Sequence, residues 1–191
     1  LKGLVAAASR YEPAARPRFL KRMAALVAAI EEGRFIMDEQ QELSQTAADR
    51  QPPEFGPRMI VLGAASLLHR LGLDADAAFG IRFIDHVLAM HWDRDGSLLV
   101  RDEIGGDRCN VGHAIELSGF ALDYLPEGDA RVDDISRLLL ASCAAGFGGP
   151  GLCLHVSAST GAHLSRYYPW WNLPEATRAA SLCYARTGDA A

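Results

Sequence analysis

The residues best suited to chemistry form the motif Asn110-Val111-Gly112-His113-Ala114-Ile115-Glu116, where a loop is expected to enter a helix. His113 and Glu116 are three residues apart, which puts both side chains on one face of a helix. There the carboxylate can hydrogen-bond to or bias the imidazole, or both groups can hold one substrate. Gly112 lets the backbone reach the helix start without a Cβ. A histidine that only caps the helix is the competing interpretation, because His-x-x-Glu is common by chance.

A second candidate is the aromatic stretch Tyr167-Tyr168-Pro169-Trp170-Trp171, which precedes another expected helix. Pyranose faces pack well on indole rings, so Trp170 and Trp171 could line a sugar site. Trp171 and Glu175 are four residues apart and share a helical face, offering a stacking plane beside a carboxylate that binds hydroxyls. The alternative is aromatic packing that fixes the loop to the core.

The other histidines are weaker candidates. His86 and His91 have acidic neighbours, which suggests a metal site, but they are five residues apart, and Asp93-Arg94-Asp95-Gly96 already fits a turn. His155 falls in an expected strand and His163 in a loop, positions that are more typical of surface residues. We therefore expect no metal. Nucleotide-binding and metalloprotease motifs are absent from the sequence.

The composition excludes several classes of protein. The 191 residues are 49% hydrophobic and 23% charged, with a net charge of −5, which indicates a globular protein. The acidic balance argues against nucleic acid as a partner. No apolar run is long enough to span a membrane, and the first residues lack signal-peptide features. The four cysteines are widely spaced and fit no metal motif, so they are expected to be reduced in a cytoplasmic protein, and a reactive role for Cys109 is disfavoured.

Helical periodicity dominates the elements that must position these residues. Counting the opening segment at Leu1, the sequence predicts about seven helices, six of them over residues 14–32, 57–71, 74–91, 111–125, 129–145 and 174–186. The helix over 57–71 is apolar on nearly every side and is expected to be buried. Asp74 is expected to cap the next helix. Short strands are predicted over residues 97–100, 102–104 and 152–156.

Short hairpins or irregular loops follow every second helix. Pairs in which one helix is buried and the next amphipathic suit an all-α (α/α)6 barrel, with short β-hairpins in its loops. A solenoid is the alternative, but no fixed repeat is present. The chain begins at Leu1 rather than Met and stops just after a helix. Residues 1–191 are therefore interpreted as a single, partial barrel domain.

Gly112-His113-Ala114-Ile115-Glu116 and the later Trp170–Glu175, with Tyr184 and Thr187-Gly188-Asp189, resemble the N-acylglucosamine 2-epimerase family in order and spacing. The resemblance covers essentially the whole chain and implies the same (α/α)6 barrel. It also implies that the protein is an isomerase, an epimerase acting on carbohydrates, which exchanges a proton at C2 of an open-chain sugar and needs no cofactor. By this resemblance His113 and Glu116 are catalytic, and the substrate-binding residues are Arg58, Trp170, Trp171 and Glu175.

The sequence departs from the family at several positions. The isomerase and cellobiose epimerase branches carry Asn and His where Gly56 and Ile60 stand here, which favours the acylglucosamine branch. Asn172-Leu173 replaces a Pro-His pair, so substrate contacts can differ. The family's second catalytic histidine lies in later helices, beyond Ala191. A half-barrel would expose part of its inner helices, which predicts aggregation or dimerisation.

The expected partner is a small-molecule sugar, with neither nucleic acid nor membrane. A homodimer and a nucleotide effector stay open by the same resemblance. The alternatives are an aldose-ketose isomerase of the mannose type and a non-catalytic barrel that binds carbohydrate or protein. A glycoside hydrolase or lyase would need a suitably placed pair of carboxylates, for which Glu116 and Glu175 are the candidates.

Overall fold

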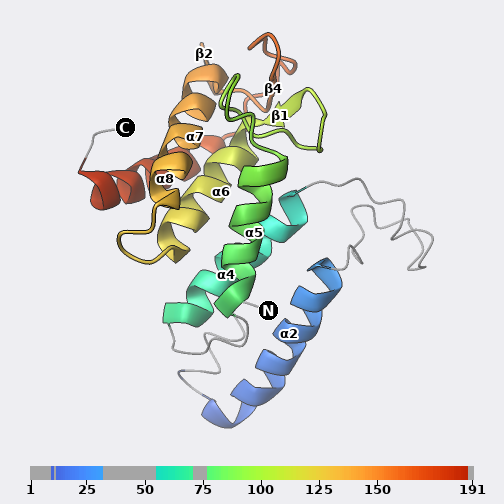
Figure 1. Cartoon of the computed structure of the whole chain (residues 1–191), viewed down its shortest axis with the longest axis vertical. Helices are drawn as coiled ribbons and strands as arrows, with labels where there is room; N and C mark the ends of the chain where they lie inside the picture. Colours follow the sequence, from blue (N-terminus) through green and yellow to red (C-terminus); the bar gives the residue numbers. More distant parts are fainter. Residues whose placement is uncertain (1–9, 11, 32–54, 71–76, 189–191) are drawn as a thin grey trace, which may run out of the picture.

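The computed structural model describes residue 10 and residues 12–31, 55–70 and 77–188 (Figure 1). This part of the chain is mostly helical, with two small antiparallel sheets of two strands each. In chain order its elements are η1 (Pro13–Ala15), α2 (Arg16–Glu31), α4 (Gly56–Arg70), α5 (Ala77–Met90), β1 (Arg108–Asn110), α6 (Val111–Tyr124), α7 (Arg131–Gly146), β2 (Phe147–Gly148), β3 (Gly151–Leu152), β4 (His155–Ser157) and α8 (Asn172–Thr187).

The helices expected from periodicity are confirmed within a few residues at each end. Six α-helices lie in the described part of the chain, and the segment at Leu1 and the predicted cap Asp74 lie outside it. The predicted burial of α4 holds for Met59, Val61 and Leu62. It fails at Ile60, whose side chain is 66% exposed.

Helix α6 is the centre of the packing. It contacts α4, α7 and α8 extensively, and Figure 1 shows it between α4 and α5 on one side and α7 and α8 on the other. Its small and aliphatic residues explain this, because Ala114, Ile115 and Ala121 are buried and let neighbouring helices approach. The N-terminus of α6 is consequently fixed from several directions.

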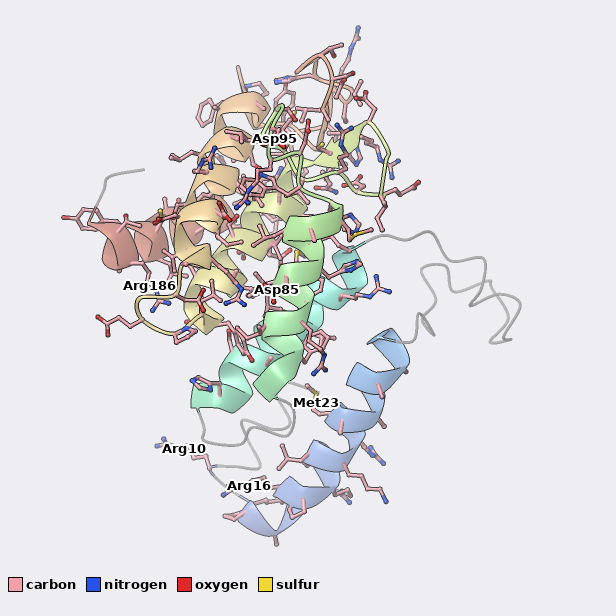
Figure 2. The ribbon with its side chains drawn as sticks, viewed as in Figure 1. Arg10, Arg16, Met23, Asp85, Asp95 and Arg186 are labelled. Atoms are coloured by element: carbon pink, nitrogen blue, oxygen red, sulfur yellow. The ribbon has the colours of Figure 1, made fainter. Side chains whose placement is uncertain are left out.

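Helix α2 joins this body through a separate, smaller cluster. Phe19 and Met23 pack against Ala64 of α4, and Figure 2 shows Met23 on the side of α2 that faces the other helices. Between α5 and the start of α7, Asp85 forms an ion pair with Arg131 at 2.6 Å. Such a partly exposed pair contributes at most about 1 kcal/mol.

Two of the predicted strands, over residues 97–100 and 102–104, do not form. Residues 97–100 form no strand, because the Asp93 carboxylate accepts hydrogen bonds from the Ser97 backbone and hydroxyl and closes a turn. Leu98 also has a positive φ of 62°, and only Val100 forms a β-bridge, with Trp92. Residues 102–104 likewise lead into a turn, in which the Gly106 N–H donates to the Glu103 carbonyl. The turn expected over 93–96 is confirmed.

The strand that forms instead is β1, which pairs with β4 in antiparallel register, Asn110 opposite His155. The predicted strand 152–156 is divided between β3 and β4. Both sheets lie at one end of the helices (Figure 1). The (α/α)6 arrangement was predicted as a ring of helix pairs, and no such ring is identified among the described elements. No helix within the described ranges has the length and apolar character needed to cross a membrane.

Gly112 tests how tightly the start of α6 is packed. A Cβ at this position would lie 2.2 Å from Asn172 Oδ1 and 2.4 Å from the Trp171 ring. Gly112→Ala should therefore lower the free energy of unfolding by roughly 1–2 kcal/mol, even though alanine favours a helix. Urea denaturation measures this. Gly149→Ala is the matched control, since a Cβ there meets nothing within 4 Å; equal stability of the two variants would contradict the packing.

Candidate functional site

Seven residues from separate parts of the chain line a cavity of about 230 Å³ at the N-terminus of α6. Pockets for drug-sized ligands are typically about 300–1,000 Å³, so this one suits a small polar molecule or the reacting end of a larger one. His113, the leading candidate of the sequence analysis, lies in it. The lining residues are Phe55, Gly56, Asp102, Arg108, Asn110, His113 and His155.

The Asp102 carboxylate links the elements that line the cavity. It is only 7% exposed, and it accepts a hydrogen bond from the Asn110 backbone N–H at 2.7 Å and one from Arg108 Nε at 2.9 Å. A buried carboxylate needs such partners, because burying a charge without them costs several kcal/mol. Asp102 therefore fixes Asn110, the last residue of β1, which leads directly into α6.

His113 is fixed in turn by Asn110. The Asn110 side chain caps α6 and accepts the His113 backbone N–H at 3.1 Å. Such a cap contributes about 1 kcal/mol to helix stability. Burial lowers the pKa of the His113 imidazole, the nearby Asp102 carboxylate raises it, and the positive charge that His155 can carry lowers it. A half-buried imidazole with a depressed pKa is neutral at pH 7 and can accept a proton.

His155 reaches the same cavity from β4. Its partner in the sheet is Asn110, and its Nε2 lies 4.0 Å from Asp102 Oδ2. Burial lowers the pKa of His155, Asp102 raises it, and Arg108 lowers it. The structure thus brings two histidines and one carboxylate together, although the sequence analysis interpreted His155 as a surface residue.

Aromatic rings enclose His113 on two sides. The Phe55 ring meets the imidazole edge-on, with centroids 6.3 Å apart, and the Trp171 ring is tilted against it at 6.2 Å. On a third side, a Cβ at Gly56 would lie 3.4 Å from His113 Cε1 and Nδ1. Glycine at position 56 therefore keeps this side of the imidazole free of a side chain.

The remaining predicted site residues lie outside this cavity. Glu116 is half-buried one turn further along α6 and is not among the lining residues. Glu175 forms an ion pair with Arg178 at 2.6 Å. Trp170 is 79% exposed, and Arg58 lines another cavity, of about 220 Å³, with Phe79, Arg82, Phe83 and His86. Of the predicted substrate-binding residues, Trp171 alone contacts His113 through a ring interaction that the structure gives.

Asp102, Arg108, His155 and Phe55 were missed in the sequence analysis. Each lies outside the two motifs, in or near a loop that the helical periodicity does not describe. A usable signal was the short run Arg108-Cys109-Asn110, which could have been recognised as the partner of the predicted strand containing His155. Asp102 offers no comparable signal, because its role depends on the turn that returns the chain to Arg108.

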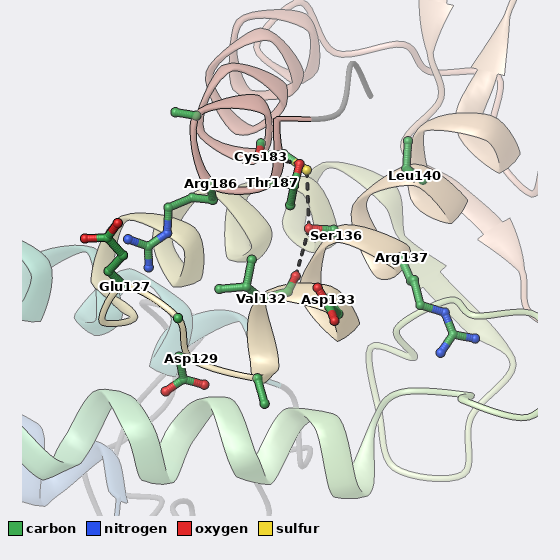
Figure 3. Close-up of a pocket in the computed structure, with 13 residues that line it drawn as sticks. Glu127, Asp129, Val132, Asp133, Ser136, Arg137, Leu140, Cys183, Arg186 and Thr187 are labelled. Carbon is green, nitrogen blue, oxygen red and sulfur yellow. Dashed lines mark hydrogen bonds between the residues drawn. The ribbon is translucent and has the colours of Figure 1, made fainter.

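A larger cavity, of about 820 Å³, lies between the start of α7 and the end of α8 (Figure 3). Several of its polar groups make structural contacts: Cys183 Sγ donates to Ser136 Oγ at 3.3 Å, and Ser136 Oγ donates to the Val132 carbonyl. Arg186 donates to the Leu125 and Pro126 carbonyls. No histidine is among the residues that line it.

The described residues contain no group of three or more His, Cys, Asp or Glu side chains that could hold a metal ion. His86 and His91 contact each other edge-on, at 5.5 Å between centroids. All four cysteines are free thiols. Burial, together with the Asp102 carboxylate, raises the pKa of Cys109 to about 12, so this thiol is not activated.

In comparisons with known proteins, the chain matches no protein-family model, no curated protein and no solved structure.

The buried histidines predict how stability depends on pH. Burial lowers the pKa of His86, His91, His113 and His155 below the ordinary value of 6.5. As the pH falls through this range the unfolded chain binds protons first, so stability is present above pH 6.5 and is lost below it. The free energy of unfolding should fall between pH 7 and pH 5, with each histidine contributing up to about 1.4 kcal/mol per pH unit.

Urea denaturation over this pH range measures the slope. His113→Gln should make it shallower, whereas His69→Gln, which changes an exposed side chain, should alter it less. Stability that is constant from pH 7 to pH 5 would contradict the burial of these imidazoles.

Proposed function

We propose that the chain carries the proton-transfer site of a sugar 2-epimerase, most closely of the N-acylglucosamine 2-epimerase type. The observation that carries the proposal is His113 itself: Asn110 accepts its backbone N–H, and its imidazole lines a small cavity beside the Trp171 ring and the Asp102 carboxylate. The sequence resemblance to that family, at Gly112-His113 and Trp170-Trp171, supports the same activity independently.

The chemistry needs no cofactor. In the open-chain sugar, the proton on C2 is acidified by the C1 carbonyl. His113 takes this proton, the C–H electron pair moves into the C1 carbonyl to form an enolate, and return of a proton to the opposite face of C2 gives the other epimer. A base with a pKa near neutrality accelerates such a transfer by about 10²–10⁴-fold. The carbonyl is restored at the end, so atoms and electrons balance.

The same proposal includes the finer fold assignment. Helices packed in pairs around a central member, with small sheets at one end, are compatible with part of an (α/α)6 barrel. The free thiols support a cytoplasmic location. Large exposed apolar side chains, among them Phe147 at 67% and Trp170 at 79%, are compatible with the aggregation or pairing expected of a partial barrel.

The other predicted residues keep roles that do not require them to line the cavity. Trp171 can stack on the sugar beside the imidazole. Glu116 can bias His113 from the same helix face, and Glu175 with Arg178 can bind hydroxyls further out. Arg58 and Trp170 are proposed only as contacts to remote parts of a larger substrate.

The geometry favours an epimerase over a glycoside hydrolase. Hydrolysis commonly requires two carboxyl groups on either side of the scissile bond. Among the described residues that line the cavity, Asp102 alone carries a carboxyl group, and it is hydrogen-bonded to Arg108. An aldose-ketose isomerase shares the first proton transfer, so the choice of sugar must be made by experiment.

Deuterium exchange tests the proposal. The protein is incubated in deuterated water with N-acetylmannosamine or N-acetylglucosamine, and NMR follows loss of the C2 proton and appearance of the other epimer. His113→Gln should reduce interconversion of the two epimers at least 100-fold, because the base that takes the C2 proton is removed.

His69→Gln provides the control, since this exposed histidine lies outside the cavity. Interconversion of the epimers that persists near the normal rate in His113→Gln would refute the assignment. Binding of the sugar by the unaltered protein, without exchange of its C2 proton, would favour the alternative of a non-catalytic carbohydrate-binding barrel. Conversion of mannose to fructose would identify the isomerase.

A further inference from the structure

We propose that the cavity between α4 and α5 is a binding site for a small tetrahedral oxoanion, phosphate or sulfate, either free or as the end group of a small metabolite. Its volume is about 220 Å³, and it shares no lining residue with the cavity that contains His113. The site therefore does not depend on the proposed function. Its lining residues are Arg58, Phe79, Arg82, Phe83 and His86.

The spacing of residues along α5 builds most of the site. Phe79, Arg82, Phe83 and His86 follow one another at helical steps of three or four, which places them on one face of the helix. Helix α4 packs against α5 and contributes Arg58 from its first turn (Figure 1). Two neighbouring helices thus bring two guanidinium groups and one imidazole to a single small cavity.

The apolar part of the lining is firmly packed. The Phe79 and Phe83 rings are stacked in parallel, with centroids 5.9 Å apart, and are only 2% and 3% exposed. Both belong to the main hydrophobic core. Charged groups beside such a wall interact more strongly with a bound anion than they would in water, because the local dielectric constant is lower.

No carboxylate among the described residues lines this cavity. The single carboxylate of α5, Asp85, is paired with Arg131 at 2.6 Å instead. Burial lowers the pKa of His86, and the positive charge of Arg58 lowers it further. The lining therefore concentrates positive charge in a half-buried place, and a bound anion would relieve the repulsion between these groups.

The donor set also fits an oxoanion. A guanidinium group presents its N–H donors as a planar fork that matches two oxygens of phosphate or sulfate. Arg58 and Arg82 take part in further interactions as well, which the five N–H donors of each guanidinium allow. The cavity is smaller than the roughly 300 Å³ at which pockets for drug-sized ligands begin, so it suits the ion or an end group rather than a whole nucleotide.

His86 makes the site sensitive to pH. The groups that influence it are Arg58 from α4, Arg82 on its own helix, and His91 just beyond the helix, whose ring meets it edge-on at 5.5 Å. Burial lowers the pKa of His91 too, so its ring adds little charge near neutral pH. A proton on His86 adds a third positive charge to the lining, and a bound anion must in turn raise the pKa of His86.

Sulfate binding, measured by calorimetry at constant ionic strength in chloride, tests the site. The unaltered protein should bind sulfate with a Kd of about 1 mM or tighter. Arg82→Gln should weaken binding at least 10-fold, and Arg82→Lys should weaken it less, because the charge is kept while the fork is lost. Arg22→Gln is the matched control: it removes the same charge from an exposed position on α2 and should change the Kd less than twofold.

The pH dependence isolates the imidazole, because sulfate itself stays a dianion near neutrality. Sulfate should bind more tightly as the pH falls from about 7.5 to about 6, and NMR should show that saturating sulfate raises the His86 pKa. His86→Gln should bind sulfate at the higher pH but lose this increase in affinity. His69→Gln, which changes an exposed histidine outside the cavity, should retain it.

Three outcomes overturn the proposal: no binding of sulfate or phosphate by the unaltered protein, equal weakening by Arg82→Gln and Arg22→Gln, or a His86 pKa that saturating sulfate leaves unchanged. Methyl phosphate distinguishes the two sources of the anion. Binding as tight as that of phosphate supports an end group of a metabolite, and binding at least 10-fold weaker supports the free ion. None of these measurements involves sugar turnover, so their failure is separate from a failure of the proposed function.

Discussion

The buried carboxylate of Asp102 is the constraint on which the candidate site depends. It satisfies the Asn110 backbone, pairs with Arg108 and biases the protonation of both His113 and His155. Buried without these donors it would be strongly destabilising, so the turn after residue 102 must return the chain to Arg108. The same requirement that stabilises the loop therefore also delivers Asn110 to the start of α6 and positions the cavity.

The site is built on elements that are themselves held firmly. Helix α6 is packed by α4, α7 and α8, and its second residue, Gly112, is so close to Trp171 and Asn172 that no side chain fits there. Asn172 is fully buried and donates to the Leu152 and Cys153 carbonyls, which ties the start of α8 to the segment preceding β4. Side chains placed on such a scaffold keep their geometry better than side chains on free loops.

Sequence reasoning succeeded where local physics decides. Helical periodicity predicted the described helices within a few residues, and the Asn110–Glu116 motif located the helix start and His113. It failed where distant segments decide. The strand expected at residues 97–100 does not form, because Ser97 donates hydrogen bonds to the Asp93 carboxylate and closes a turn. His155 reaches the cavity only because β4 pairs with β1. Spacing along a helix correctly suggests that Glu116 shares a face with His113, but it cannot show which side chains line a cavity formed between separate elements.

The opposing effects on the two imidazoles have a consequence for the proposed chemistry. Burial lowers the pKa of both, so each is readily available as a neutral base at pH 7 but is a less stable cation than free imidazole. Asp102 offsets this penalty for a single positive charge, whereas a second charge would meet the first as well as Arg108. Under the proposed function the site can therefore carry one transferable proton, and His113 is free to act as the neutral base while the positive charge stays off its ring.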